Sequence, residues 1–159
     1  MLALLGCTPK YDWREVHGAD APFSVILPAK PATFARPINL DGVQVTMAMT
    51  AAEIDGVTFA VGSVQLSDAA AARAALSKMK TALVKNINGS IKHEKLSAQT
   101  EQVPTIDIEA SGNSNGQPYL LVARFAAKDN RAYQVIVVGR EKAVSREAVD
   151  TFLTSFKLN

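Results

Sequence analysis

The most apolar stretch of the sequence lies between residues 118 and 139. It contains two runs rich in β-branched and aromatic residues, 119–125 and 132–138, with Asp129 and Asn130 between them. Asp and Asn tolerate the left-handed backbone of a tight turn, so this pattern predicts a β-hairpin. Both runs are apolar on nearly both faces, which is typical of strands in the middle of a sheet that is covered on both sides.

The N-terminal half predicts an antiparallel meander of four strands. Asp41-Gly42 and Asp55-Gly56 are strong signals for two-residue hairpin turns between alternating runs. Pro37 is the residue that fits this interpretation least, because proline cannot donate a ladder hydrogen bond. The four predicted strands are residues 23–27, 34–40, 43–49 and 57–64.

Two segments have helical periodicity. Residues 69–87 follow possible caps at Ser67 and Asp68, and Gly89 stands where a left-handed residue would end the helix. A second helix is predicted after Ser145, which can cap it. Each helix has one apolar stripe that we expect to face the sheet: Ala72, Leu76, Met79, Leu83 and Ile87 in the first, and Val149, Phe152, Leu153 and Phe156 in the second.

Three shorter strands complete the prediction. Residues 11–16 alternate as an edge strand whose Trp13 should pack on the sheet, and residues 90–96 form a weaker, polar candidate. Residues 105–110 alternate clearly and place Asp107 and Glu109 on the same face. The Gly-, Asn- and Ser-rich residues 111–117 are predicted to form a loop.

Together these elements predict an α+β protein, in which a long middle helix and a C-terminal helix pack on an antiparallel β-sheet. The 159 residues suit one domain, and 48% hydrophobic and 20% charged residues are globular values. A net charge of +2 gives no reason to expect nucleic acid as a partner. No apolar run is long enough to span a membrane. With one cysteine, Cys7, neither an internal disulfide nor a cysteine-based metal site can form.

The sequence holds few candidates for catalysis. His17 and His93 are the two histidines, and neither has a partner at metal-ligand spacing. Asp107 and Glu109 could bind a cation from one strand face, although such a pair is more often simply solvated. We therefore expect no enzyme activity, no cofactor and no metal ion.

Near the N-terminus, Leu4-Leu5-Gly6-Cys7 resembles the lipobox of bacterial lipoproteins. The resemblance implies that residues 1–6 are a truncated remnant of a signal peptide and that Cys7 is the lipid-attachment residue. Residues 7–10 would then be the lipidated cysteine and its tether, and residues 11–159 a single α+β domain. Because Thr8, not Asp, follows the cysteine, the resemblance implies the periplasmic face of the outer membrane, with the inner membrane as the lesser expectation. The alternative is a frayed apolar terminus with a free thiol.

The order of elements between residues 22 and 158 resembles the PsbP-like α/β/α sandwich. The residues that carry this likeness are 23–28 near the start and 131–139 running to 152–158. The resemblance implies a non-catalytic module that docks on another envelope protein or stabilises a complex, and no functional residue is carried over with it. The alternative is a carrier of a small molecule or lipid. A large apolar cavity under Leu76, Met79 and Leu83 would favour the carrier.

Overall fold

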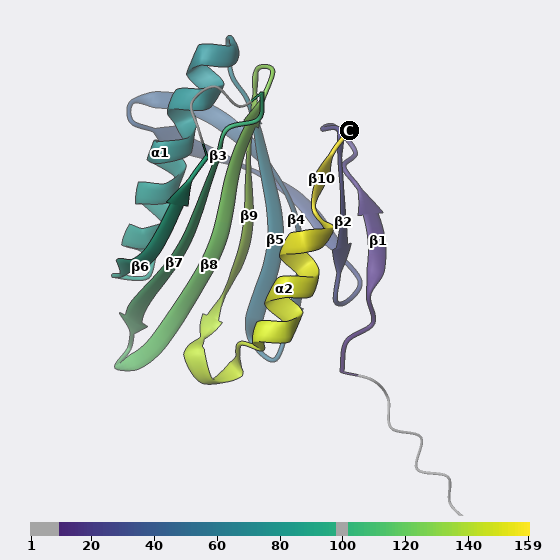
Figure 1. Cartoon of the computed structure of the whole chain (residues 1–159), viewed down its shortest axis with the longest axis vertical. Helices are drawn as coiled ribbons and strands as arrows, with labels where there is room; N and C mark the ends of the chain where they lie inside the picture. The colour runs from purple at the N-terminus through teal and green to yellow at the C-terminus, as the bar shows by residue number, and fades with distance from the viewer. Residues whose placement is uncertain (1–9, 98–101) are drawn as a thin grey trace, which may run out of the picture.

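The structure is a computed structural model and describes residues 10–97 and 102–159 (Figure 1). Cys7 and the predicted signal-peptide remnant, residues 1–6, lie outside these ranges. Seven of the described strands form one antiparallel sheet with the order β3-β4-β5-β9-β8-β7-β6. Its strands are β3 (Ala32–Leu40), β4 (Val43–Ile54), β5 (Val57–Gln65), β6 (Ser90–Leu96), β7 (Thr105–Ser114), β8 (Gln117–Lys128) and β9 (Arg131–Arg140).

The remaining elements cover the two faces of this sheet. Helix α1 (Ala69–Asn86) lies on one face, while α2 (Arg146–Ser155) lies on the other, next to a small sheet (Figure 1). A short 3-10 turn, η1 (Glu141–Ala143), leads from β9 into α2. The small sheet has the order β1-β2-β10 and consists of β1 (Arg14–His17), β2 (Phe23–Leu27) and β10 (Lys157–Leu158). The α+β prediction of an antiparallel sheet with a long middle helix and a C-terminal helix is confirmed.

Strand β9 is the centre of the structure and pairs with β5 and β8. Its side chains alternate between two separate hydrophobic clusters: Ala132 and Ile136 pack on the α1 side, whereas Val135 and Val137 pack on the α2 side. The hairpin with β8 closes through the predicted turn, in which Asp129 has a φ of 53°. The interpretation of this hairpin as a doubly covered central element is therefore correct.

Helix α1 begins where the sequence predicted, because the Asp68 carboxylate accepts a hydrogen bond of 2.7 Å from the Ala71 N–H. Its predicted stripe is buried against the sheet, apart from the half-buried Leu83. The helix end differs from the prediction. Asn88, with a φ of 49°, takes the left-handed conformation, and Gly89 donates its N–H to the Val84 carbonyl at 2.9 Å.

On the opposite face, aromatic rings join α2 and the small sheet to the large one. Ser145 caps α2 by accepting a hydrogen bond from the Ala148 N–H, as predicted. Phe152 is fully buried, and its ring lies edge-on to that of Phe59, 5.5 Å away between centroids. Trp13 packs on the same Phe59 at 6.4 Å, which confirms its predicted role.

Two predictions about strand arrangement were wrong. Strand β2 does not belong to the meander, because it pairs with β1 and with β10 at the far end of the chain. The meander is therefore β3-β4-β5, and Pro37 is tolerated in it because β3 is an edge strand. The loop expected at residues 111–117 is instead a continuation of β7 and β8, joined by a turn at Asn115 and Gly116.

Burial of α2 should contribute strongly to stability. We expect Phe152→Ala to lower the free energy of unfolding by about 3–5 kcal/mol, because it removes apolar contacts and leaves a cavity. Leu153→Ala is the matched control, since Leu153 is only half-buried on the same helix. Chemical denaturation of the two variants measures the difference. If both variants lower the free energy of unfolding by the same small amount, α2 is not part of the core.

Candidate functional site

A cavity of about 290 Å³ lies between α1 and the β3-β4-β5-β9 part of the sheet. Helix α1 forms one side of it with Met79, Ala82, Leu83 and Asn86. The sheet provides the floor and the opposite wall: Phe34, Arg36, Ile38, Asn39, Leu40, Met47, Met49, Ala51, Thr58, Ala60, Gln134, Ile136 and Val138. This is the position at which the sequence analysis placed the pocket of a carrier, although Leu76 does not line it.

The cavity follows from the way α1 sits on the sheet. The helix contacts mainly β8 and β9, with fewer contacts to β7 and β3. The strands on the β3 side of β9 are therefore only partly covered, and the residues that face α1 there include the small Ala60 and Gly62. A side chain on Gly62 would begin 2.8 Å from both the Met47 and Met49 sulfur atoms. The missing side chain leaves room for these thioethers.

Three of the four methionines line this cavity: Met47, Met49 and Met79. All three are buried, so they belong to the core as well as to the cavity wall. A methionine side chain is unbranched and polarizable, and it adapts to the shape of what it packs against. A wall made of such side chains can fit apolar molecules of several shapes.

Gln134 and Arg36 are the features of this site that the sequence analysis missed. Gln134 is only 5% exposed and lines the cavity from the centre of the sheet. Gln134 interrupts an otherwise apolar run in β9. This polar residue in an apolar strand was the sequence signal that could have pointed to the site. Arg36 lies on the edge strand β3, where a charged residue is ordinary. No local pattern could place it beside a cavity.

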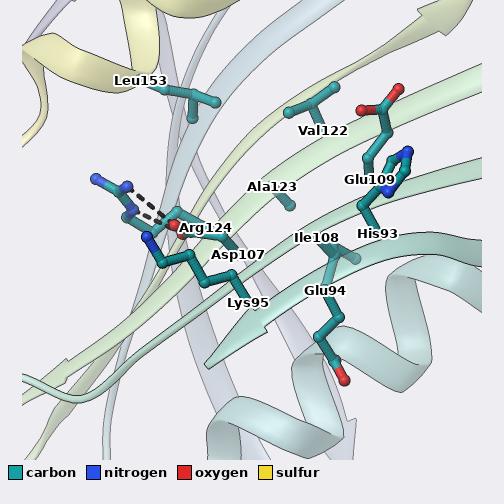
Figure 2. A pocket seen from close by; sticks show the side chains of 10 residues that line it. All are labelled: His93, Glu94, Lys95, Asp107, Ile108, Glu109, Val122, Ala123, Arg124 and Leu153. Atoms are coloured by element: carbon teal, nitrogen blue, oxygen red, sulfur yellow. Dashed lines mark hydrogen bonds and ion pairs between the residues drawn. The ribbon is translucent and has the colours of Figure 1, made fainter. Parts of the chain in front are cut away.

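A second, shallower depression of about 260 Å³ lies on the opposite face of the sheet, beside α2 (Figure 2). Its apolar part consists of Leu153 of α2, Val122 and Ala123 of β8, and Ile108 of β7. Polar side chains from β6, β7 and β8 form the rest: His93, Lys95, Asp107, Glu109 and Arg124. The depression therefore combines an apolar surface with several charged side chains.

The predicted pair Asp107 and Glu109 lies in this depression, and both carboxylates already have cationic partners. Asp107 accepts two hydrogen bonds from Arg124, of 2.7 and 3.0 Å. Glu109 accepts one from Arg146 of α2. That hydrogen bond is the main reason why the pKa of Glu109 is lowered, and the charges of Arg146 and His93 lower it further against the opposing effect of burial. Each of the two carboxylates is thus already paired with an arginine, so the pair is poorly suited to bind a metal cation.

The two histidines lie far apart in the topology. His93 is in β6, opposite Glu109 of β7, whereas His17 is in β1 of the small sheet and lies 3.3 Å from Glu15. Across the described ranges, no three side chains of the His, Cys, Asp or Glu type gather closely enough to hold a metal ion. The structure therefore places His93 opposite Glu109 of the predicted carboxylate pair and leaves His17 apart from both.

Within residues 10–97 and 102–159, neither helix combines the length and hydropathy needed to cross a bilayer. No protein-family model and no curated protein sequence matches the chain.

The ion pair between Glu109 and Arg146 should make stability depend on pH. A carboxyl whose pKa is lower in the folded than in the unfolded protein stabilises the fold above the unfolded value, and that contribution is lost as pH falls through the folded value. At neutral pH, Glu109→Gln should be less stable than the wild type by up to about 1 kcal/mol. The difference should shrink as pH falls below the ordinary glutamate value of 4.5.

Melting curves between neutral and acidic pH test this expectation. Glu53→Gln is the matched control, because Glu53 is exposed on β4. A Glu109→Gln variant that stays as stable as the wild type at neutral pH would show that the ion pair contributes nothing.

Proposed function

We propose that the folded domain binds a small apolar molecule in the cavity between α1 and the sheet. The observation that carries this proposal is the cavity itself, bounded by Met79 and Leu83 on the helix and by Met47 and Met49 on β4. Ligand sites are concave and mostly apolar with a few polar groups, and their volumes begin near 300 Å³. The volume of about 290 Å³ fits one small ligand. Of the two hypotheses from the sequence, the geometry thus favours the carrier.

We further propose that the protein is a bacterial lipoprotein with a PsbP-like sandwich domain. Acylation of Cys7 would hold the domain on the periplasmic face of the outer membrane through a short tether, residues 7–10. The support is the lipobox-like sequence that ends at Cys7, together with the order of elements in the domain. A domain held next to a membrane would meet apolar molecules that leave or enter the bilayer.

A non-catalytic docking function is the second candidate, and one observation favours it. The depression beside α2 presents charged side chains on a part of the sheet that α2 leaves open, including Lys95, Asp107 and Arg124 (Figure 2). Charges arranged in this way favour specificity for a partner with a complementary surface. Such a partner would be another envelope protein. Ligand binding on one face and docking on the other are compatible, and neither needs a catalytic group.

Apolar binding can be tested with a fluorescent probe whose emission rises in an apolar environment. We expect the purified domain, residues 10–159, to bind such a probe in a saturable way. Ala82 is exposed on α1 and lines the cavity. Ala82→Trp should therefore obstruct the entrance, because the indole would occupy space that the probe needs. We expect the probe to bind this variant about tenfold more weakly, or weaker still.

Ala74→Trp is the matched control, because Ala74 is an exposed residue of α1 that does not line the cavity. It should bind the probe as the wild type does. If both tryptophan variants bind equally well, the probe occupies another surface and the carrier proposal is wrong.

The lipid anchor is tested by the mature N-terminus of the protein from its native host. We expect a mass that corresponds to an acylated Cys7 at the first position, and we expect the protein to sediment with membranes. Cys7→Ser removes the thiol that accepts the lipid, so that variant should remain uncut and unacylated. An unmodified wild-type Cys7 still preceded by Met1 to Gly6 would contradict the lipoprotein proposal.

A further inference from the structure

One charged side chain lines the cavity, and it is cationic. Of the described residues around the cavity, Arg36 is the only one with a formal charge. It projects from β3 on the α1 side of the sheet, because Arg36 is in register with Met47 and Phe34 with Met49, and both methionines pack toward α1. Arg36 is therefore the direct cross-strand neighbour of Met47 on the same face of the sheet.

The guanidinium of Arg36 has no carboxylate partner among the described residues within ion-pair distance. Its contact is instead with the ring of Phe34, and the distance from the guanidinium carbon to the ring centroid is 5.3 Å. Both residues are exposed on the edge strand β3. Stacking on an aromatic ring holds the planar group in place, while its N–H donors remain available to an anion.

We propose that the ligand of the cavity is a single-chain amphiphile with an anionic head group. This inference rests on the proposed function and assigns its ligand class. The apolar chain would lie among Met47, Met49 and Met79, and the head group would bind Arg36. A carboxylate or phosphate matches the fork of N–H donors that a guanidinium presents.

The register of the sheet gives the path of the chain. Phe34, Met49, Gly62 and Gln134 are successive cross-strand neighbours on the α1 side, from the edge strand β3 to the central strand β9. Three strand spacings separate the two ends, which is about 14 Å. A medium-length alkyl chain can extend over that distance. The absent side chain at Gly62 keeps the path open between Met49 and Gln134.

The head-group preference can be measured with three ligands that share one chain: decanoate, decanol and decylamine. Each would displace the fluorescent probe from the domain, residues 10–159. We expect decanoate to bind about fivefold more tightly than decanol, as one solvent-accessible ion pair allows, and decylamine to bind more weakly than either. Arg36→Gln should remove the advantage of decanoate while decanol binds as before, and Arg36→Lys should restore part of it.

Arg73→Gln is the matched control, because it removes one arginine from α1 away from the cavity and changes the net charge equally. It should keep the preference for decanoate. If decanoate and decanol bind the wild type equally, or if both glutamine variants lose the preference, the assignment to Arg36 is wrong while apolar binding still stands. If none of the three ligands displaces the probe, the carrier proposal fails as well.

Discussion

The structure depends on the need to cover both faces of β9. This strand and its neighbours expose apolar side chains on each side, with Ile136 toward one cluster and Val135 and Val137 toward the other. An antiparallel sheet can leave one face to solvent, but a strand that is apolar on both faces cannot. Helix α1 covers one side, and α2 with the small sheet covers the other (Figure 1). The order of the elements along the chain follows from this requirement.

The helices and the small sheet cover each face of the large sheet only in part. The two candidate sites lie where this cover is missing. Helix α1 packs mainly on β8 and β9, so β4 and β5 are only partly covered. The gap that remains is lined by methionines, whose side chains are flexible. On the other face, α2 leaves the outer strands open, and there the exposed side chains are charged and paired, as Arg124 is with Asp107. One gap is apolar with a single cation at its margin, and the other combines apolar residues with ion-paired charged side chains. They suit different partners.

Local patterns in the sequence predicted the elements well and their distant pairings less well. Asp41-Gly42 and Asp55-Gly56 predicted two turns correctly because the chemistry of a turn lies within a few residues. Strand β10 has two residues and forms only because the end of the chain reaches β2, so no local signal could show it. The helix side of the cavity was anticipated at Met79 and Leu83, but its sheet side was missed for the same reason. Its lining comes from strands and a helix whose register is set by tertiary packing, and Arg36 looks like any polar residue of an edge strand.

The position of the ligand is the central claim, and the methionines are natural probes of it. Protein labelled with ¹³C at the methionine methyl groups would give separate signals for Met47, Met49 and Met79, which can be assigned by single replacement with leucine. On titration with decanoate, we expect the three signals to shift together and to saturate with one affinity, because all three side chains line the same cavity. If the ligand binds while these three signals stay unchanged, the cavity between α1 and the sheet is not the binding site.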